Sequence, residues 1–262
     1  MIREPSKWSG TVASAANEPR PAHCGHETSP LPPPSQPTGC LRRLLLPTRR
    51  DRPGVRWYLR FALSYRDVEE LLGERGIEVD HVTIYRWVQR FTPLLAEAAR
   101  PCRHAVGHRW QVDETYVKVA GQWRYVYHAV DQFGQVIDVF MSAHRDARAA
   151  HRFFDRAIGT TGSTPTEVVT DRAAAYPTVL DELLPAVWHC TERYANNRVE
   201  ADHGRLKARL RPMRGLKQDR STRIVAGHGL VQNLRRGHYE LGVEEPASLR
   251  VAVAFDELAL AI

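Results

Sequence analysis

The chain of 262 residues has few cysteines and no long apolar run. Its cysteines, Cys24, Cys40, Cys102 and Cys190, are widely spaced and form no Cys-x-x-Cys pair. This scarcity argues against a disulfide-stapled secreted domain and against a zinc ribbon, and it favours a reduced protein. The N-terminus also lacks the charged-then-apolar order of a signal peptide. We therefore expect a cytoplasmic protein with no membrane partner.

Acidic residues are almost absent from one stretch, residues 203–220, which carries seven Lys or Arg and one Asp. Much of the chain's formal net charge of +7 is therefore concentrated locally. A basic stretch of this kind is typical of a surface that meets the phosphates of a nucleic acid. The residues that we expect to make such contacts are Arg205, Lys207, Arg209, Arg211, Arg214 and Lys217.

Residues 1–54 lack any apolar periodicity and hold ten of the seventeen prolines. They carry eight Arg or Lys against four Asp or Glu. A proline-rich segment with so little apolar content cannot build a core, so we predict a disordered basic arm.

Helical signals begin after this arm. A short helical run covers Val55–Phe61, and Ser64 with Asp67 forms an acidic variant of the capping box at the start of a second helix. Gly76 is the predicted C-cap of that helix, and Asp80 is the predicted N-cap of a third. Pro93 lies near the expected end of the third helix.

Two short capped helices separated by a glycine turn predict a helix-turn-helix DNA-binding domain over residues 55–100. The third helix would then be the recognition helix. Its outward residues, expected to reach base edges or phosphates, are His81, Thr83, Arg86 and Gln89. A plain helical bundle without a role in DNA binding is the alternative.

The next segment, residues 101–225, alternates between strand and helix patterns. Three β-rich runs separated by turns predict an antiparallel meander over residues 110–119, 123–130 and 135–142. Helices are expected at 146–158, 173–184 and 197–210, with short strands at 166–171 and 186–190. This order predicts an α/β fold in which a mixed sheet carries helices on both faces. Residues 226–262 are expected to be a C-terminal helical segment.

Three carboxylates stand out in this pattern. Asp113 lies inside a core strand, Asp171 follows a later strand, and Glu200 lies near the start of the helix at 197–210. Carboxylates from two strands and a helix can converge on Mg²⁺ or Mn²⁺, which prefer oxygen ligands. Two such ions, about 3.5–4 Å apart, would support an in-line phosphoryl transfer.

Each carboxylate also has an ordinary structural explanation. Asp113 could pair with an arginine, Asp171 could cap the following helix, and Glu200 could form a capping box with Asn197. Glu114 alternates to the other face of its strand, so it forms no dyad with Asp113. His203 shares a helix side with Glu200 and is a minor candidate.

Three segments of the sequence resemble the acidic motifs of DDE transposases, in particular those of bacterial insertion-sequence family 6. The segments are Trp110-Gln-Val-Asp-Glu-Thr-Tyr-Val-Lys-Val119, Thr170-Asp-Arg-Ala-Ala-Ala-Tyr-Pro177 and Asn196-Asn-Arg-Val-Glu-Ala-Asp-His-Gly-Arg-Leu-Lys207. Residues 56–60 and 63–72 resemble the helix-turn-helix of that family. The resemblance spans Val55 to Gly242. The 28 residues between Asp171 and Glu200 are fewer than is common in the family, and we expect the loss to lie in loops around residues 185–193.

The resemblance implies a ribonuclease-H-like catalytic core, preceded by a small all-α helix-turn-helix domain. It implies two Mg²⁺ or Mn²⁺ ions held by Asp113, Asp171 and Glu200, and a contact of Lys207 with DNA phosphate. The implied function is a homo-oligomeric, nucleoid-associated bacterial transposase, which nicks insertion-sequence ends and joins the 3′-hydroxyl to target DNA. A structure-specific nuclease of the same fold, or a DNA-binding remnant or repressor without catalysis, is the alternative.

Overall fold

The computed structural model describes residues 51–192, 196–213, 216–217 and 222–262, which belong to one compact unit, residues 43–262. The predicted arm up to residue 50 lies outside the described residues. In the segments that are described, no helix is long and apolar enough to cross a membrane.

The N-terminal helices are α1 (Asp51–Arg60), α2 (Tyr65–Gly73) and α3 (His81–Ala99). Helix α1 begins four residues before the predicted start, so Pro53 and Gly54 lie inside its first turn, where a proline is tolerated. Helix α3 is longer than predicted and contains Pro93 in its interior. The three predicted helices are therefore present, while their role in reading DNA stays a prediction.

The predicted N-caps of α2 and α3 are confirmed. The Ser64 hydroxyl accepts from the Asp67 amide, and the Asp67 carboxylate accepts from the Ser64 amide. Asp80 accepts from the amides of Val82 and Thr83. The C-cap of α2 is Glu74 rather than Gly76. Gly76 instead has a φ of +71°, a left-handed conformation that lets the chain turn toward α3 and that side chains disfavour.

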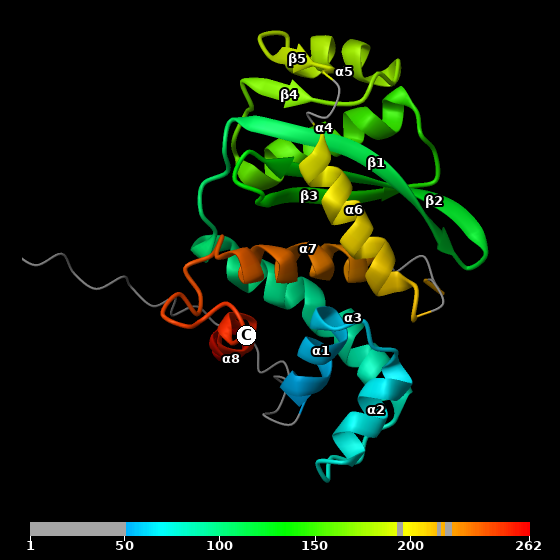
Figure 1. The fold of residues 1–262 in the computed structure, drawn as a ribbon, viewed down its shortest axis with the longest axis vertical. Helices are drawn as coiled ribbons and strands as arrows, with labels where there is room; N and C mark the ends of the chain where they lie inside the picture. Colours follow the sequence, from blue (N-terminus) through cyan, green and yellow to red (C-terminus); the bar gives the residue numbers. More distant parts are fainter. Residues whose placement is uncertain (1–50, 193–195, 214–215, 218–221) are drawn as a thin grey trace, which may run out of the picture. The chain divides into compact units, whose positions relative to one another are not determined.

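The segment after the N-terminal helices contains a five-stranded mixed sheet in the order β3-β2-β1-β4-β5. Its strands are β1 (Arg109–Val119), β2 (Gln122–Asp131), β3 (Val136–Ser142), β4 (Glu167–Val169) and β5 (Trp188–Cys190). β1, β2 and β3 form the predicted antiparallel meander, and β4 and β5 join it in parallel. This order confirms the predicted ribonuclease-H-like fold class (Figure 1).

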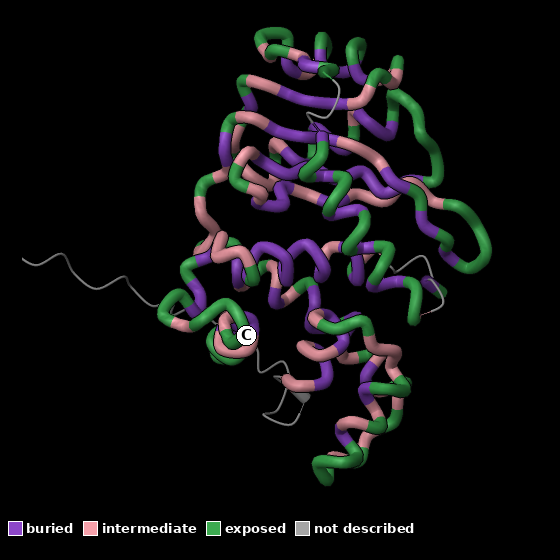
Figure 2. Tube along the Cα trace, viewed as in Figure 1, coloured by how far each residue is buried: buried purple, intermediate pink, exposed green. Residues whose placement is uncertain are grey.

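Helices cover both faces of the sheet. α4 (Ala147–Thr161) and α5 (Ala175–Leu183) share a buried cluster with Trp110, Val112 and Tyr127. α6 (Asn197–Leu210) and α7 (Thr222–Arg236) pack against the opposite face, where Val117 and Val119 are buried. Figure 2 shows that the central strands are buried along most of their length. The first part of β1 is thus shielded from water on both faces, which favours burial of its apolar side chains, whereas Tyr116 and Lys118 near the hairpin are exposed.

Helix α7 crosses the border predicted at residues 225/226, and most of it lies within the helical segment expected over residues 226–262. It is buried along most of its length and contacts α1, α3, α8 (Arg250–Ala261) and β3. One hydrophobic cluster therefore includes side chains from α1, α2 and α3 together with others from β1 and β2. The helices predicted as a separate DNA-binding domain share this core with the sheet.

Candidate active site

The three predicted carboxylates line one cavity of about 440 Å³. We call it the carboxylate cavity; its other lining residues are Thr170, Arg172, Thr191, Glu192 and Asn196. Asp113 comes from β1, Asp171 lies two residues after the end of β4, and Glu200 belongs to the first turn of α6. Carboxyl ends of parallel strands commonly form ligand sites, and here one such end meets a helix start.

Asp113 is the most deeply placed of the three, with 18% of its side chain exposed. Its Oδ1 accepts from the Glu114 amide, and its Oδ2 lies 3.5 Å from Nδ1 of His203. Burial raises the pKa of Asp113 to about 7, and the charges of Glu114, Asp171 and Glu200 add to the effect. The alternative that Asp113 pairs with an arginine is therefore wrong, because its neighbour is a histidine.

Asp171 is held by a cation that the sequence analysis missed. Nη2 of Arg145, from the loop before α4, donates to Oδ2 of Asp171 at 2.8 Å. Asp171 Oδ1 accepts from the amide of Ala173 at 2.9 Å, but the N-cap of α5 is Ala174, so Asp171 does not cap that helix. One carboxylate is therefore oriented by both a guanidinium and a backbone amide.

Arg145 is itself anchored by a buried acid. Its Nε donates to Glu114, whose side chain is 3% exposed and also accepts from the hydroxyl of Tyr176. Glu114 projects to the face opposite Asp113, as predicted from strand alternation. Burial raises the pKa of Tyr176 far above its usual range, and the charge of Glu114 raises it further. Tyr176 therefore stays a neutral hydrogen-bond donor to Glu114.

Glu200 does not form the capping box with Asn197 that was the alternative to a role as a ligand. The N-cap of α6 is Asn196, not Asn197, and its side chain makes no capping bond. Nδ2 of Asn196 instead donates to the carbonyl of Val112 at 3.1 Å and ties the start of α6 to β1. The Glu200 side chain has no hydrogen-bond or ion-pair partner within the described ranges, and it is exposed.

A buried polar cluster lies behind the cavity, between β2, α6 and α7. It contains His128, His203 and His228, whose pKa values burial lowers to about 4, 3 and 3. Asp202, 1% exposed, is paired with Arg236 and Arg205. Burial alone would raise the pKa of Asp202, but the bonds from Arg236 and the charges around it lower it. The histidines are therefore neutral, and Asp202 supports the fold.

The donor chemistry of the cavity suits a hard cation. Asp113, Asp171 and Glu200 offer oxygen atoms only, which is the ligand set of Mg²⁺ or Mn²⁺. Across the residues that the structure describes, however, no three acidic, His or Cys side chains form a ready coordination shell. Metal binding would therefore require the carboxylates to turn toward a common point.

The predicted DNA-reading residues of α3 do not all face outward. Gln89 is 6% exposed, so its assignment as a base-reading residue is wrong. Thr83 uses its hydroxyl to bond Asp80 within the helix cap. His81 pairs with Glu69 at 3.0 Å and is 41% exposed in its side chain. Arg86 is exposed and remains available to DNA.

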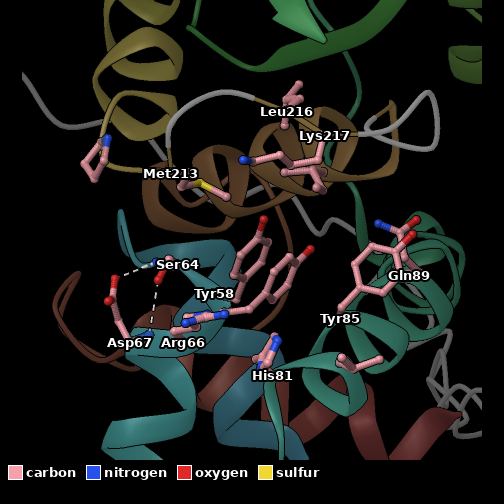
Figure 3. Close-up of a pocket in the computed structure, with 14 residues that line it drawn as sticks. Tyr58, Ser64, Arg66, Asp67, His81, Tyr85, Gln89, Met213, Leu216 and Lys217 are labelled. Carbon is pink, nitrogen blue, oxygen red and sulfur yellow. Dashed lines mark hydrogen bonds between the residues drawn. The ribbon is translucent and has the colours of Figure 1, made fainter. Parts of the chain in front are cut away.

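His81 and Gln89 line a second cavity, of about 900 Å³, together with Lys217 of the basic stretch (Figure 3). We call it the tyrosine cavity because Tyr58, Tyr65 and Tyr85 also line it. The rings of Tyr58 and Tyr65 stack with centroids 4.0 Å apart. The predicted recognition helix, α3, and the basic stretch therefore meet at one cavity.

The basic stretch divides into exposed and buried members. Arg209 is 5% exposed, stacks over the ring of Tyr58 and donates to its carbonyl. Its predicted DNA contact is wrong, because the guanidinium lies inside the protein. Arg205 is about half exposed but bonds Asp202. Lys207, Arg211 and Lys217 are exposed, and Arg214 lies outside the described residues.

Comparisons with known proteins agree with these motifs. A family described as "DDE domain" matches residues 107–238. The transposase for insertion sequence-like element IS431mec of Staphylococcus aureus (strain Mu50 / ATCC 700699) is 39% identical over 160 residues, which cover 59% of this chain and 71% of that protein. The transposase for insertion sequence element IS257 in transposon Tn4003 of Staphylococcus aureus has the same identity and coverage.

Two solved structures of the HTLV-2 integrase catalytic core domain in complex with magnesium also resemble the chain. The trimeric form is 21% identical, covers 58% of this chain and 99% of that one, and has a TM-score of 0.42. The dimeric form is 24% identical, covers 42% and 73%, and has a TM-score of 0.35. These likenesses are distant, and no conclusion rests on them.

The matched segment is half of the chain and contains Asp113, Asp171 and Glu200 with all three acidic motifs. The curated relatives share 39% identity across 71% of their own length. The chain therefore belongs to the DDE transposases of bacterial insertion-sequence family 6.

Proposed function

We propose that this chain is an active transposase that binds the inverted ends of its insertion sequence, nicks the DNA and joins the freed 3′-hydroxyl to a target strand. The observation that carries the proposal is the carboxylate cavity, where Asp113, Asp171 and Glu200 from three elements line one space. Family membership supports the same reaction class. DNA is the proposed partner, and the proposed location is the nucleoid in the bacterial cytoplasm.

Asp113, Asp171 and Glu200 would hold two Mg²⁺ or Mn²⁺ ions. When bound, such ions activate an attacking oxygen and stabilise a leaving one. Asp113 must lose its proton to serve as a ligand, and its raised pKa of about 7 makes this step dependent on pH near neutrality. Arg145 would keep Asp171 oriented, since its guanidinium is fixed by Glu114 on the far side.

The remaining roles concern the DNA. Lys207, Arg211 and Lys217 are exposed cations on α6 or just after it, and we propose that they contact phosphates beside the reacting strand. Arg86 is the exposed α3 residue that we propose contacts the element's end. Because an insertion sequence has two ends, at least two copies of the chain would act together.

The test is a strand-transfer assay on the full chain. The substrate is a duplex that carries the terminal inverted repeat flanking the gene, mixed with plasmid target and Mg²⁺. Joined product supports the proposal. Nicking without joining would identify a nuclease, and end binding without either reaction would identify a DNA-binding remnant or repressor. A Glu200→Gln variant should bind the duplex normally and yield no nicked product.

A further inference from the structure

The hairpin between β1 and β2 exposes two large aromatic side chains, one of them on the strand that carries Asp113. Tyr116 and Trp123 are each 57% exposed, and their rings meet edge to face with centroids 5.2 Å apart. In the strand register Tyr116 lies opposite Tyr125 and Lys118 lies opposite Trp123, so the two rings are diagonal neighbours on one face. A single exposed aromatic side chain is common on a protein surface, but two exposed rings in contact form an apolar patch of the kind that marks a binding surface.

Two lysines accompany the rings. Nζ of Lys118 lies 5.6 Å from the ring centroid of Trp123, and Nζ of Lys207, from α6, lies 4.8 Å from that of Tyr116. Both lysines are exposed. We call this group, Tyr116, Lys118, Trp123 and Lys207, the hairpin patch. Aromatic rings set among ammonium groups match a partner with flat faces and negative charge, which describes a nucleic-acid strand.

The hairpin patch also lies at a defined distance from the carboxylates. β1 and α6 run alongside each other: Asn196 bonds Val112, His203 approaches Asp113, and Lys207 reaches Tyr116. Three residues of a strand or seven residues of a helix each span about 10 Å. Along the backbone, both elements therefore lead from the proposed ligands Asp113 and Glu200 to the hairpin patch over a similar length, and Tyr116 projects from the strand face opposite that of Asp113.

We propose that the hairpin patch binds the DNA strand beside the scissile phosphate, with an unpaired base stacked on Tyr116 and Trp123. Lys118 and Lys207 contact the neighbouring phosphates. Since the backbone separation between the carboxylates and the hairpin patch is about 10 Å, the stacked base lies within a few nucleotides of the reacting phosphate. The inference rests on the proposed function, because it uses the carboxylates as the site of reaction.

A second copy of this chain is the rival occupant of the exposed rings. A two-fold contact centred on the hairpin patch would bring Lys118 and Lys207 of one copy against the same lysines of the other. Like charges in an interface disfavour it unless acids intervene, and the four residues of the hairpin patch include no acid. Charge complementarity therefore favours DNA over a second protomer.

The test uses the full chain with Mg²⁺ and a duplex of generic sequence that carries a single-stranded extension. Generic sequence suffices because stacking on aromatic rings tolerates any base. One position of the extension at a time carries 2-aminopurine, whose fluorescence falls when it stacks. The variants are Tyr116→Ala, Trp123→Ala and Trp123→Phe. Trp188→Ala is the matched control, because Trp188 is 62% exposed on β5.

Quenching should appear at one or two adjacent positions of the extension in the wild-type protein and in the control. Tyr116→Ala and Trp123→Ala should each weaken binding roughly tenfold or more and remove that quenching, since stacking of one base contributes strongly to affinity. Trp123→Phe should restore both. Because the replaced side chains are exposed, the thermal midpoints of all variants should match that of the wild type.

The outcomes separate this inference from the proposed function. If the wild type joins strands while both alanine variants bind, quench and join as it does, the hairpin patch does not bind DNA. A loss of self-association in these variants, with DNA binding unchanged, would identify a protomer contact instead. If the wild type binds and quenches but never joins strands, the proposed function fails while the hairpin patch stands.

Discussion

The carboxylate cavity and the tyrosine cavity differ in the elements that line them and in the contacts that support the lining side chains. Asp113 comes from the interior of β1, Asp171 follows β4 and Glu200 lies at the start of α6. The exposed Arg145, anchored by the buried Glu114, supports Asp171. The tyrosine cavity is lined by helix faces, by stacked rings and by the segment after α6. The first is a small polar site on a rigid sheet, and the second is a larger space between helices.

This difference matters for what each region can do. Chemistry needs charged groups held within a fraction of an ångström, which a sheet with buried supports provides. DNA reading needs exposed side chains on a helix, and in the tyrosine cavity two predicted readers, His81 and Gln89, are partly or fully buried instead. The predictions below test whether the two regions are as separate in function as in construction.

The largest effect should come from the carboxylates. Asp113→Ala, Asp171→Ala and Glu200→Ala should each lower the rate of DNA cleavage by about a thousandfold or more, because each removes an oxygen ligand from a two-metal site. Binding of the element's end should be nearly unchanged. Gel-shift and cleavage assays on one duplex measure both. If one of these variants cleaves DNA at a near-normal rate, the replaced residue is not a metal ligand.

Arg209, the buried arginine of α6, should contribute to the stability of the fold rather than to DNA binding. Arg209→Ala removes a stacked guanidinium, leaves a cavity and strips the Tyr58 carbonyl of its donor. We expect a loss of about 2–4 kcal/mol in the free energy of unfolding. Arg211→Ala, at an exposed position, should change it by less than about 0.5 kcal/mol. Urea unfolding measures both, and equal stability would return Arg209 to the list of DNA contacts.

Several elements of the fold were predictable from the sequence, because their signals are local. The cap at Asp80, the hairpin turn at Ala120–Gly121 and the α6 bounds follow from residue type and periodicity over a few positions. In that turn both residues have positive φ, as two-residue hairpins favour. The three carboxylates could be singled out because acids in or beside core strands are costly without a function.

The missed features depend on contacts between distant segments. Nothing in the local sequence around Arg145 shows that it bridges Glu114, 31 residues away, and Asp171, 26 residues away. Helix α7 contains two glycines and a buried His228, so its helical pattern is weak although its packing is extensive. The one signal that was present was Glu114 itself: an acid on a covered strand face requires a partner.

Arg145 should affect metal binding by an intermediate amount. Arg145→Ala frees Asp171 from its guanidinium partner and should weaken binding of Mn²⁺ about 10- to 100-fold, as expected for a residue that orients a metal ligand. Arg145→Lys should recover part of this loss. Calorimetric titration of the DNA-free protein measures it without any turnover, and Arg148→Ala, exposed on α4, is the control. Tighter binding in Arg145→Ala would mean that the guanidinium competes with the metal.

The recognition-helix prediction now depends mainly on Arg86. Arg86→Ala should weaken binding to the element's own end by about 1–3 kcal/mol. It should also reduce the difference in affinity between that end and a scrambled duplex. Arg90→Ala, exposed one turn later on α3, should weaken both duplexes to a similar and smaller extent. Titrations at two salt concentrations measure the difference. Equal weakening of both duplexes by Arg86→Ala would leave α3 as a packing element.

The smallest expected effect concerns the stability of the metal-free protein and its dependence on pH. The pKa of Asp113 is raised to about 7 by burial, whereas the unfolded value is about 3.9. Between these values the folded protein holds a proton that the unfolded chain has released. The free energy of unfolding therefore falls as the pH rises through this window, and the loss is complete above about pH 7.

Asp113→Asn removes the cost of ionising a buried carboxylate, since the amide carries no charge at any pH. In a chelator at pH 8, the variant should be more stable than the wild type, and the difference should shrink toward zero near pH 4. Added Mg²⁺ should stabilise the wild type and have little effect on the variant. Asp155→Asn, exposed on α4, should show neither behaviour. An Asp113→Asn variant that is less stable than the wild type at pH 8 would mean that the carboxylate is a structural partner of His203 rather than a ligand awaiting a cation.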